Sequence, residues 1–175
     1  MKLAVSNIGW NIQHEKKYLT ILKKNKISNL EVVPLKLFKS WKNVKKENII
    51  KLKKYYAKNN LKIISIQGIF YQKKFSFYKK NDLEKIILHL KKIILICRYL
   101  DCKHIVFGSP DMRRGKKDKF QIALGNFALV IKKINNFLEK NQIYLSIEPV
   151  SKIYNCDLLN NISETINFCK QLYLA

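Results

Sequence analysis

The strongest constraint on the fold is a regular alternation of short apolar runs with longer amphipathic segments. Five apolar runs predict strands at residues 2–8, 27–33, 61–70, 102–107 and 143–148. Apolar residues at helical spacing predict helices at residues 15–26, 47–59, 81–100, 118–140 and 162–172. Because strand and helix alternate throughout, we expect a parallel sheet with right-handed crossovers. Such a sheet is either doubly wound or part of an eight-stranded barrel.

The length and composition indicate one globular domain, which we place at residues 1–175. The chain is 47% apolar, an ordinary value for a domain with a core. No apolar run reaches the roughly 18 residues of a membrane span, and the first ten residues lack the apolar segment of a secretory signal. Four cysteines stand without C-x-x-C spacing, which is typical of reduced thiols and of neither a zinc site nor a disulfide framework. We therefore expect a cytoplasmic protein with no membrane partner.

The net charge of +23 raises the question of a nucleic-acid partner. All but three of the 35 basic residues are lysine, the exceptions being Arg98, Arg113 and Arg114. Reading bases and clamping phosphates favour arginine. The chain is also rich in Ile, Asn, Tyr and Phe and poor in Gly and Pro, which suggests a genome of low G+C content in which lysine fills exposed positions. We therefore expect no specific nucleic acid, only a weak, salt-sensitive affinity for polyanions.

Polar residues gather where the predicted strands end. They are Ser6, Asn7, Glu31, Gln67, Ser109 and Glu148. No glycine-rich phosphate-binding motif follows any strand, which argues against a nucleotide site. The carboxyl ends of parallel strands meet at one edge, so these side chains suit the mouth of a barrel. Each could instead serve only to cap a loop or shape a turn.

Glu148 is the most informative of these residues. It ends the apolar run 144–147 and precedes Pro149, which favours an extended backbone at the carboxyl end of a strand. A carboxylate there is a hard oxygen donor, suited to a divalent cation. The alternative is a salt bridge to one of the many lysines.

Taken together, the strand-end motifs resemble those of the sugar phosphate isomerase/epimerase family, which has xylose isomerase-like TIM barrels. The matching stretches follow one another in the family's order. They are residues 6–10 (SNIGW), 30–38 (LEVVPLKLF), 65–70 (SIQGIF), 106–110 (VFGSP) with Arg113, and 147–149 (IEP) followed by 154–157 (YNCD).

The resemblance implies a (β/α)8 barrel that interconverts keto sugars or sugar phosphates with a divalent metal such as Mn²⁺, Mg²⁺ or Co²⁺. It implies that Glu148 binds this metal and helps to exchange the proton beside the substrate carbonyl. It further implies that five residues face the substrate, with the arginine holding a phosphate or carboxylate. These are Trp10, Glu31, Gln67, Ser109 and Arg113. Asp157 reads as a structural hydrogen-bond acceptor.

The chain is shorter than the barrels of the family that it resembles. An eight-stranded barrel of this kind needs about 250 residues, and the pattern supplies the N-terminal five βα units, so the barrel looks truncated. The family's other metal ligands, an aspartate, a histidine and a second glutamate, come from later strands. His14, His89 and His104 do not replace them convincingly. The chain could be a piece of a normal enzyme, a decayed product, or one half of a barrel completed by self-association or a complementing chain.

The sequence is therefore compatible with three functions. The first is a metal-dependent sugar or sugar-phosphate isomerase or epimerase. The second is a catalytically inactive barrel remnant that acts as a binding or assembly module. The third is an apurinic endonuclease-like nuclease, which would need a histidine-rich metal cluster.

Overall fold

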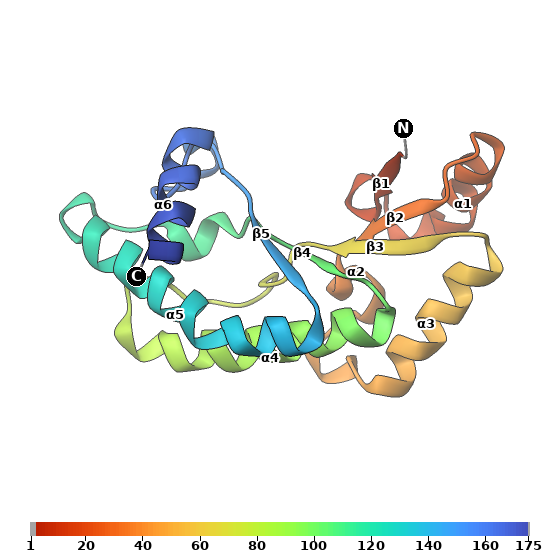
Figure 1. The fold of residues 1–175 in the computed structure, drawn as a ribbon. Coiled ribbons are helices and arrows are strands. Elements are labelled where there is room, and N and C mark those ends of the chain that lie inside the picture. Colours follow the sequence, from red (N-terminus) through yellow and green to blue (C-terminus); the bar gives the residue numbers. More distant parts are fainter. Residues whose placement is uncertain (1–2, 175) are drawn as a thin grey trace.

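The computed structural model describes residues 3–174 and contains one sheet of five parallel strands in the order β1-β2-β3-β4-β5 (Figure 1). The strands are β1 (Ala4–Ser6), β2 (Asn29–Val32), β3 (Lys62–Ile66), β4 (His104–Phe107) and β5 (Tyr144–Ile147). Each strand pairs with the next one along the chain. The parallel sheet and sequential order predicted from the alternation are confirmed, although each strand is shorter than expected.

The helices follow the strands as predicted. They are α1 (Glu15–Lys24), α2 (Pro34–Phe38), α3 (Lys46–Lys58), α4 (Leu83–Leu100), α5 (Phe120–Asn141) and α6 (Ile162–Leu174). The sequence pattern does not predict the short helix α2, because a proline directly after an apolar run is typical of the end of a strand. Proline also suits the first position of a helix, where no amide hydrogen is needed. No helix among the described residues combines the length and apolarity that crossing a bilayer requires.

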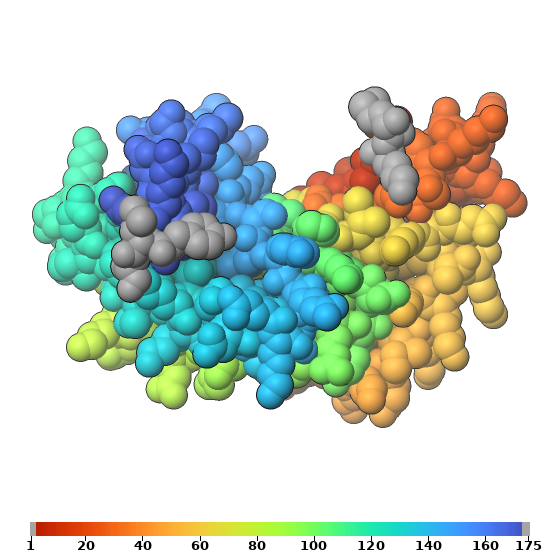
Figure 2. All heavy atoms as spheres, in the orientation of Figure 1, coloured from red at the N-terminus to blue at the C-terminus, as the bar shows by residue number. Residues whose placement is uncertain are grey.

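The two faces of the sheet differ sharply. Side chains such as Leu30, Ile66 and Phe107 point toward the helices and are fully buried. Helices α3, α4 and α5 cover this face (Figure 1). The other face carries polar side chains, among them Glu31 and His104, and Figure 2 shows a wide hollow between the first and last parts of the chain. The sheet therefore has one packed outer face and one open inner face.

Aromatic rings fill the core beside β4. Phe127 of α5 stacks on Phe77 with ring centroids 4.3 Å apart, and it packs against Phe107 at 5.0 Å and Phe168 of α6 at 5.1 Å. Such rings bury large apolar areas, so this cluster joins β4, α5 and α6 into one unit. It holds the carboxyl end of β4, where the candidate site lies.

Helix α6 is capped by Asn161, the residue before its first position. Ser163, a plausible cap by residue type, lies inside the helix. The Asn161 side chain accepts a hydrogen bond from the Glu164 amide at 2.9 Å, and Glu164 accepts one from the Asn161 side chain at 2.7 Å. This reciprocal pair satisfies groups that the first turn leaves unpaired.

Candidate functional site

A polar cluster joins the carboxyl ends of β1, β2 and β3. The Ser65 hydroxyl donates to one oxygen of Glu31 at 2.7 Å, and the Gln67 amide donates to the other at 2.6 Å. The same amide nitrogen lies 2.6 Å from the Ser6 hydroxyl oxygen. Strand register brings these residues together, since Glu31 lies opposite both Ser6 and Ser65, with an irregularity between Leu30 and Glu31. The predicted meeting of Glu31 and Gln67 at one edge is therefore observed.

Ser65 was missed as part of this cluster, although the sequence carried a signal for it. Alternate residues of a strand share a face, so Ser65 lies on the same side as Gln67. It is buried, at 8% exposure. Its hydroxyl fixes one carboxylate oxygen of Glu31, which leaves the cluster rigid and half-buried.

Glu148 lies just past the end of β5 with an exposed side chain. Its backbone amide donates to the Phe107 carbonyl at 3.1 Å, which ties it to β4. Its carboxylate lies against Gly108, where an added Cβ would stand 2.4 Å from the Glu148 Oε2 atom. Within residues 3–174, this carboxylate takes part in none of the ion pairs or side-chain hydrogen bonds. The alternative, a salt bridge to a lysine, is thus not observed among these residues.

Gly108 is a second position that sequence reasoning missed. A glycine directly after a strand was the available signal, since it allows close approach of another group. Here the approaching group is the Glu148 carboxylate, which occupies the space of a missing Cβ.

Arg113 holds the ends of β4 and β5 from inside. It is fully buried, and its guanidinium donates to the carbonyl oxygen of Glu148 at 2.9 Å and to that of Phe107. It also lies over the rings of Phe107 and Phe127, 5.5 and 5.6 Å from their centroids. Burial lowers the pKa of Arg113, while the nearby Cys156 and Glu148 oppose that shift. Instead of facing the mouth, this arginine therefore binds the backbone beneath Glu148.

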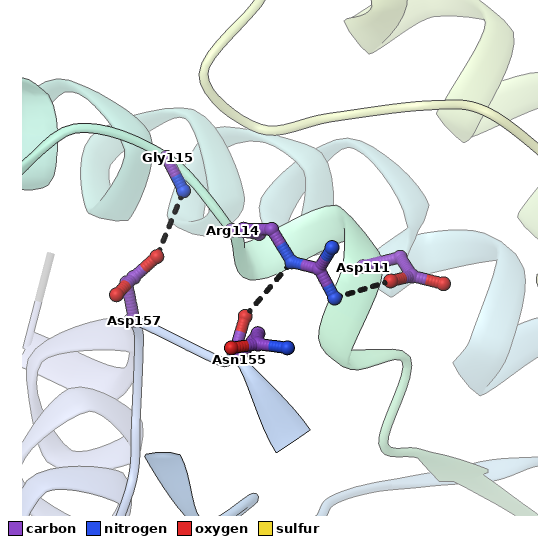
Figure 3. A network of polar contacts seen from close by, with 5 residues as sticks. All are labelled: Asp111, Arg114, Gly115, Asn155 and Asp157. Atoms are coloured by element: carbon purple, nitrogen blue, oxygen red, sulfur yellow. Dashed lines mark hydrogen bonds and ion pairs between the residues drawn. The ribbon is translucent and has the colours of Figure 1, made fainter. Parts of the chain in front are cut away.

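Polar contacts join the loop after β4 to the loop after β5 (Figure 3). Arg114 pairs with Asp111 at 3.0 Å and donates to the Asn155 carbonyl at 3.2 Å. Asp157 accepts a hydrogen bond from the Gly115 amide at 2.9 Å. The structural role predicted for Asp157 is confirmed, and these contacts join the segment after Gly108 to the segment after Glu148.

Ser109 lies in the loop after β4 and has a left-handed backbone conformation. Its φ and ψ angles are 46° and 63°, in the left-handed region that residues other than glycine rarely adopt. Its side chain is half-buried. Eight other non-glycine residues of the described chain also have a positive φ, so this conformation alone does not mark a functional position.

Trp10 is buried and held by contacts with Glu15 and Tyr18. Its indole donates to Glu15, whose other carboxylate oxygen accepts a hydrogen bond from the Tyr56 hydroxyl at 2.5 Å. Its ring stacks on Tyr18, with centroids 5.2 Å apart. Burial and then the Glu15 hydrogen bond raise the pKa of Tyr56, so the hydroxyl stays protonated. The indole nitrogen thus already has a buried partner. Only 6% of the surface of Trp10 is exposed, and only this part can contact a ligand.

A depression of about 460 Å³ adjoins Trp10. The Lys36 ammonium lines it and donates to the carbonyl oxygens of Asn7 at 2.7 Å, Ile8 at 3.2 Å and Trp10. Lys36 was not singled out in the sequence, where it was one of many lysines. Its contacts fix the loop after β1 at the mouth.

The histidines lie away from the carboxyl ends of the strands. His14 is exposed before α1, and His104 begins β4 at the end opposite Gly108, stacked on Tyr144 at 5.4 Å. His89 is buried in α4, where its Nε2 lies 2.7 Å from the Ile69 carbonyl oxygen. Burial lowers the pKa of His89 to about 4, against the effect of that hydrogen bond.

The described residues alone do not complete a metal centre. They contain no group of three or more His, Cys, Asp or Glu side chains that could hold an ion. Glu148 offers one unengaged carboxylate, whereas both oxygens of Glu31 already accept hydrogen bonds. One carboxylate is too few for Mg²⁺ or Mn²⁺, which prefer about six oxygen ligands.

Comparisons with known proteins identify the fold. The sequence matches no protein-family model and no curated protein. A D-psicose 3-epimerase crystallised with D-fructose is similar in structure, with a TM-score of 0.77 and 16% identity over 98% of this chain and 60% of that one. A 3-keto-D-glucoside 4-epimerase from E. coli has a TM-score of 0.73 and 11% identity over 100% of this chain and 65% of that one. The IOLI protein with a bound zinc atom has a TM-score of 0.72 and 16% identity over 99% of this chain and 59% of that one.

These neighbours establish the architecture and its extent. The chain has the fold of the xylose isomerase-like TIM barrels found in sugar epimerases and isomerases. It spans about three fifths of the length of the first structures that it matches. Its five parallel strands are thus five βα units of that barrel, as the motifs predicted.

Proposed function

We propose that this chain belongs to the sugar isomerases and epimerases whose fold it has, and that it binds a keto sugar at the carboxyl edge of its sheet. One observation carries the proposal: the Glu148 carboxylate stands unengaged at the end of β5. The neighbouring structures include a D-psicose 3-epimerase with D-fructose, which supports a small ketose as ligand. We propose residues 1–175 as one partial barrel domain, and a cytoplasmic location stays a prediction.

The proposed chemistry is proton transfer beside the ketose carbonyl. A carboxylate can remove the proton from the adjacent carbon while the electron pair passes to the carbonyl oxygen, and a proton delivered from water on the opposite face then inverts that carbon. Glu148 is the base in this proposal. The polar cluster of Glu31, Gln67, Ser6 and Ser65 would orient the sugar hydroxyls, since positioning the reacting carbon lowers the barrier.

The remaining predicted residues would act around this base. Ser109 and the exposed part of Trp10 would border the sugar. Arg113 would act on Glu148 from beneath, because its guanidinium binds the Glu148 carbonyl oxygen. Whether the sugar carries a phosphate stays a prediction, as does the use of Mn²⁺, Mg²⁺ or Co²⁺ with Glu148 as one ligand. No step of this proposal passes through a metal.

The test is a turnover assay with the purified chain. It would be incubated with D-fructose and, separately, D-tagatose, and the products separated by chromatography. We expect 3-epimers to form with the wild type and with Glu47→Gln, which changes an exposed carboxylate on α3. We expect none with Glu148→Gln. Equal turnover by Glu148→Gln, or none by the wild type, would refute the proposal.

A binding or assembly role is the second candidate. The observation that favours it is the open sheet: in the described part of the chain, β1 pairs only with β2, and β5 only with β4. Unpaired strand edges are surfaces on which another polypeptide can add a strand.

A further inference from the structure

Four helices of this chain, α1, α3, α4 and α5, end in the same backbone motif. A residue in the left-handed conformation follows each helix, and the amide after it donates to the carbonyl oxygen five residues earlier at 3.0 Å. The amide donors are Ile27, Leu61, Cys102 and Ile143, and the acceptors are Leu22, Tyr56, Cys97 and Leu138. This Schellman motif brings the side chains of donor and acceptor residue together. It forms the joints that precede β2, β3, β4 and β5.

Three of these joints place apolar side chains at the two positions. The pairs are leucine with isoleucine after α1 and α5, and tyrosine with leucine after α3. At the joint between α4 and β4 both positions are cysteine, and Cys97 and Cys102 are buried, with exposed fractions of 0% and 2%. The other joints supply the usual apolar contact of this motif without sulfur. Packing alone therefore does not require two cysteines at this joint.

The two sulfurs are in contact. Cys97 Sγ lies 3.3 Å from Cys102 Sγ and 3.0 Å from the Cys102 carbonyl oxygen. Among the cysteines of residues 3–174, this is the one pair joined by a hydrogen bond between sulfurs. The sulfurs of a disulfide lie about 2.05 Å apart. An approach of roughly 1.2 Å would therefore allow a covalent bond across the joint.

We propose that Cys97 and Cys102 form a reversible redox site, in which a disulfide closes across the joint between α4 and β4. The free thiols of the described structure are its reduced form. In reducing compartments, disulfides that do form are usually transient and redox-sensing. The site lies next to β4, which is paired on both sides within the sheet. The proposal goes beyond the proposed function and does not depend on it.

The oxidant in this proposal is a small disulfide such as oxidised glutathione. The Cys102 thiolate attacks one glutathione sulfur, and the other glutathione leaves as a thiolate. Cys97 then loses its proton and attacks Cys102 Sγ, which releases the second glutathione thiolate. The chain gives up two electrons and two protons, and one glutathione disulfide becomes two glutathione thiols. An excess of a reducing thiol reverses both steps.

The geometry assigns the attacking role to Cys102. The hydrogen bond from the Cys97 thiol lowers the pKa of Cys102 and raises that of Cys97. The thiolate is the nucleophile in thiol exchange. Cys102 also lies between the exposed residues Asp101 and Lys103, at the end of α4. Because Cys102 itself is buried, exchange requires this helix end to open, and helix ends open more readily than the whole fold.

The first test is a peptide map at redox equilibrium. The purified chain would be held in mixtures of reduced and oxidised glutathione until the thiol count stops changing, then denatured in acid, alkylated and digested with trypsin. Trypsin cleaves after Lys92, Arg98 and Lys103, so the disulfide would join two separate peptides, 93–98 and 99–103. We expect this linked pair without attached glutathione. Dithiothreitol should restore all four free thiols.

Thermal unfolding is the second measurement. The disulfide closes a six-residue loop, so it should raise the thermal midpoint by about 4–8 °C relative to the reduced chain. Cys102→Ala should give no linked peptides and the same midpoint in both redox states. Cys156→Ala is the matched control, because Cys156 is also buried and its sulfur contacts the Leu158 carbonyl oxygen instead of a second sulfur. It should behave as the wild type.

Comparison with the unfolded chain shows whether the fold favours the disulfide. In urea, the linked peptides should require a higher ratio of oxidised to reduced glutathione than in the folded chain, because unfolding separates the two sulfurs. The proposal would be overturned by thiols that stay free at every ratio, or by separate glutathione adducts on Cys97 and Cys102. Linked peptides that form as readily in urea, or a disulfide that lowers the thermal midpoint, would overturn it as well.

Discussion

Replacing Arg113 by methionine tests the role of the buried guanidinium. Methionine keeps much of the length and apolar volume of the side chain but removes the charge and the donors. Arg113 is fully buried and donates to the carbonyl oxygens of Phe107 and Glu148. The substitution therefore removes a donor from both carbonyl oxygens, although the Phe107 oxygen keeps the Glu148 amide as a donor.

The magnitude follows from these contacts. A hydrogen bond from a charged donor contributes about 1.5–3 kcal/mol to stability. Two such bonds therefore give roughly 3–6 kcal/mol, and the contacts with Phe107 and Phe127 add about 1 kcal/mol. Removing a buried charge offsets part of this loss, because the desolvation cost disappears. We expect a net loss of about 3–5 kcal/mol in the free energy of unfolding.

Urea denaturation followed by circular dichroism measures this loss, with the free energy extrapolated to zero urea. The matched control is Arg114→Met at the next position, where the side chain is 52% exposed and pairs with Asp111. Exposed ion pairs contribute about 0–1 kcal/mol. Equal free energies for the two variants would show that Arg113 does not hold the ends of β4 and β5.

Three further predictions concern Gly108, Tyr56 and His89. Gly108→Ala should displace the Glu148 carboxylate, since the new Cβ would stand 2.4 Å from Oε2, and abolish turnover while leaving the thermal midpoint nearly unchanged. Tyr56→Phe should cost about 1.5–3 kcal/mol in urea denaturation, because it removes a hydrogen bond to the buried Glu15 carboxylate. The folded chain keeps His89 neutral down to about pH 4, whereas the unfolded chain protonates it near pH 6.5. The unfolded state thus binds more protons between these values, so stability should fall as the pH is lowered from about 6.5 to 4.

Each of these predictions has a control at a comparable residue. Gly9→Ala should keep turnover, because a Cβ at Gly9 meets nothing within 4 Å. Tyr71→Phe should be neutral, since Tyr71 is 60% exposed. His89→Gln should flatten the fall in stability with acid, and the exposed His104→Gln should not. A pH profile that His89→Gln leaves unchanged would contradict the assigned protonation.

The fold was predictable because its elements carry strong local patterns. Five apolar runs alternate with amphipathic helices, and that order alone predicts parallel pairing. Helix α2 could not be predicted, since Pro34 is equally compatible with the end of a strand and the start of a helix. Strand ends were also misplaced, because short 3-10 turns such as Asn7–Gly9 replace what reads as strand.

The sequence predicted the positions of those site residues that lie at the ends of strands. Register brings Glu31 and Gln67 together, and the carboxyl end of β5 places Glu148. The position of Arg113 could not be read from the sequence. Whether a loop arginine faces solvent or the backbone depends on packing against Phe107 of β4 and Phe127 of α5, which the local sequence around Arg113 does not reveal.

The most direct test of the central claim is wash-in of solvent deuterium. The chain would be incubated with D-fructose in heavy water, and deuterium at the carbon beside the carbonyl followed by NMR. This reports proton removal by Glu148 even when little epimer accumulates. We predict exchange with the wild type and Glu47→Gln and none with Glu148→Gln. Exchange that Glu148→Gln leaves undiminished, or its absence from the wild type, would contradict the assignment of Glu148 as the base.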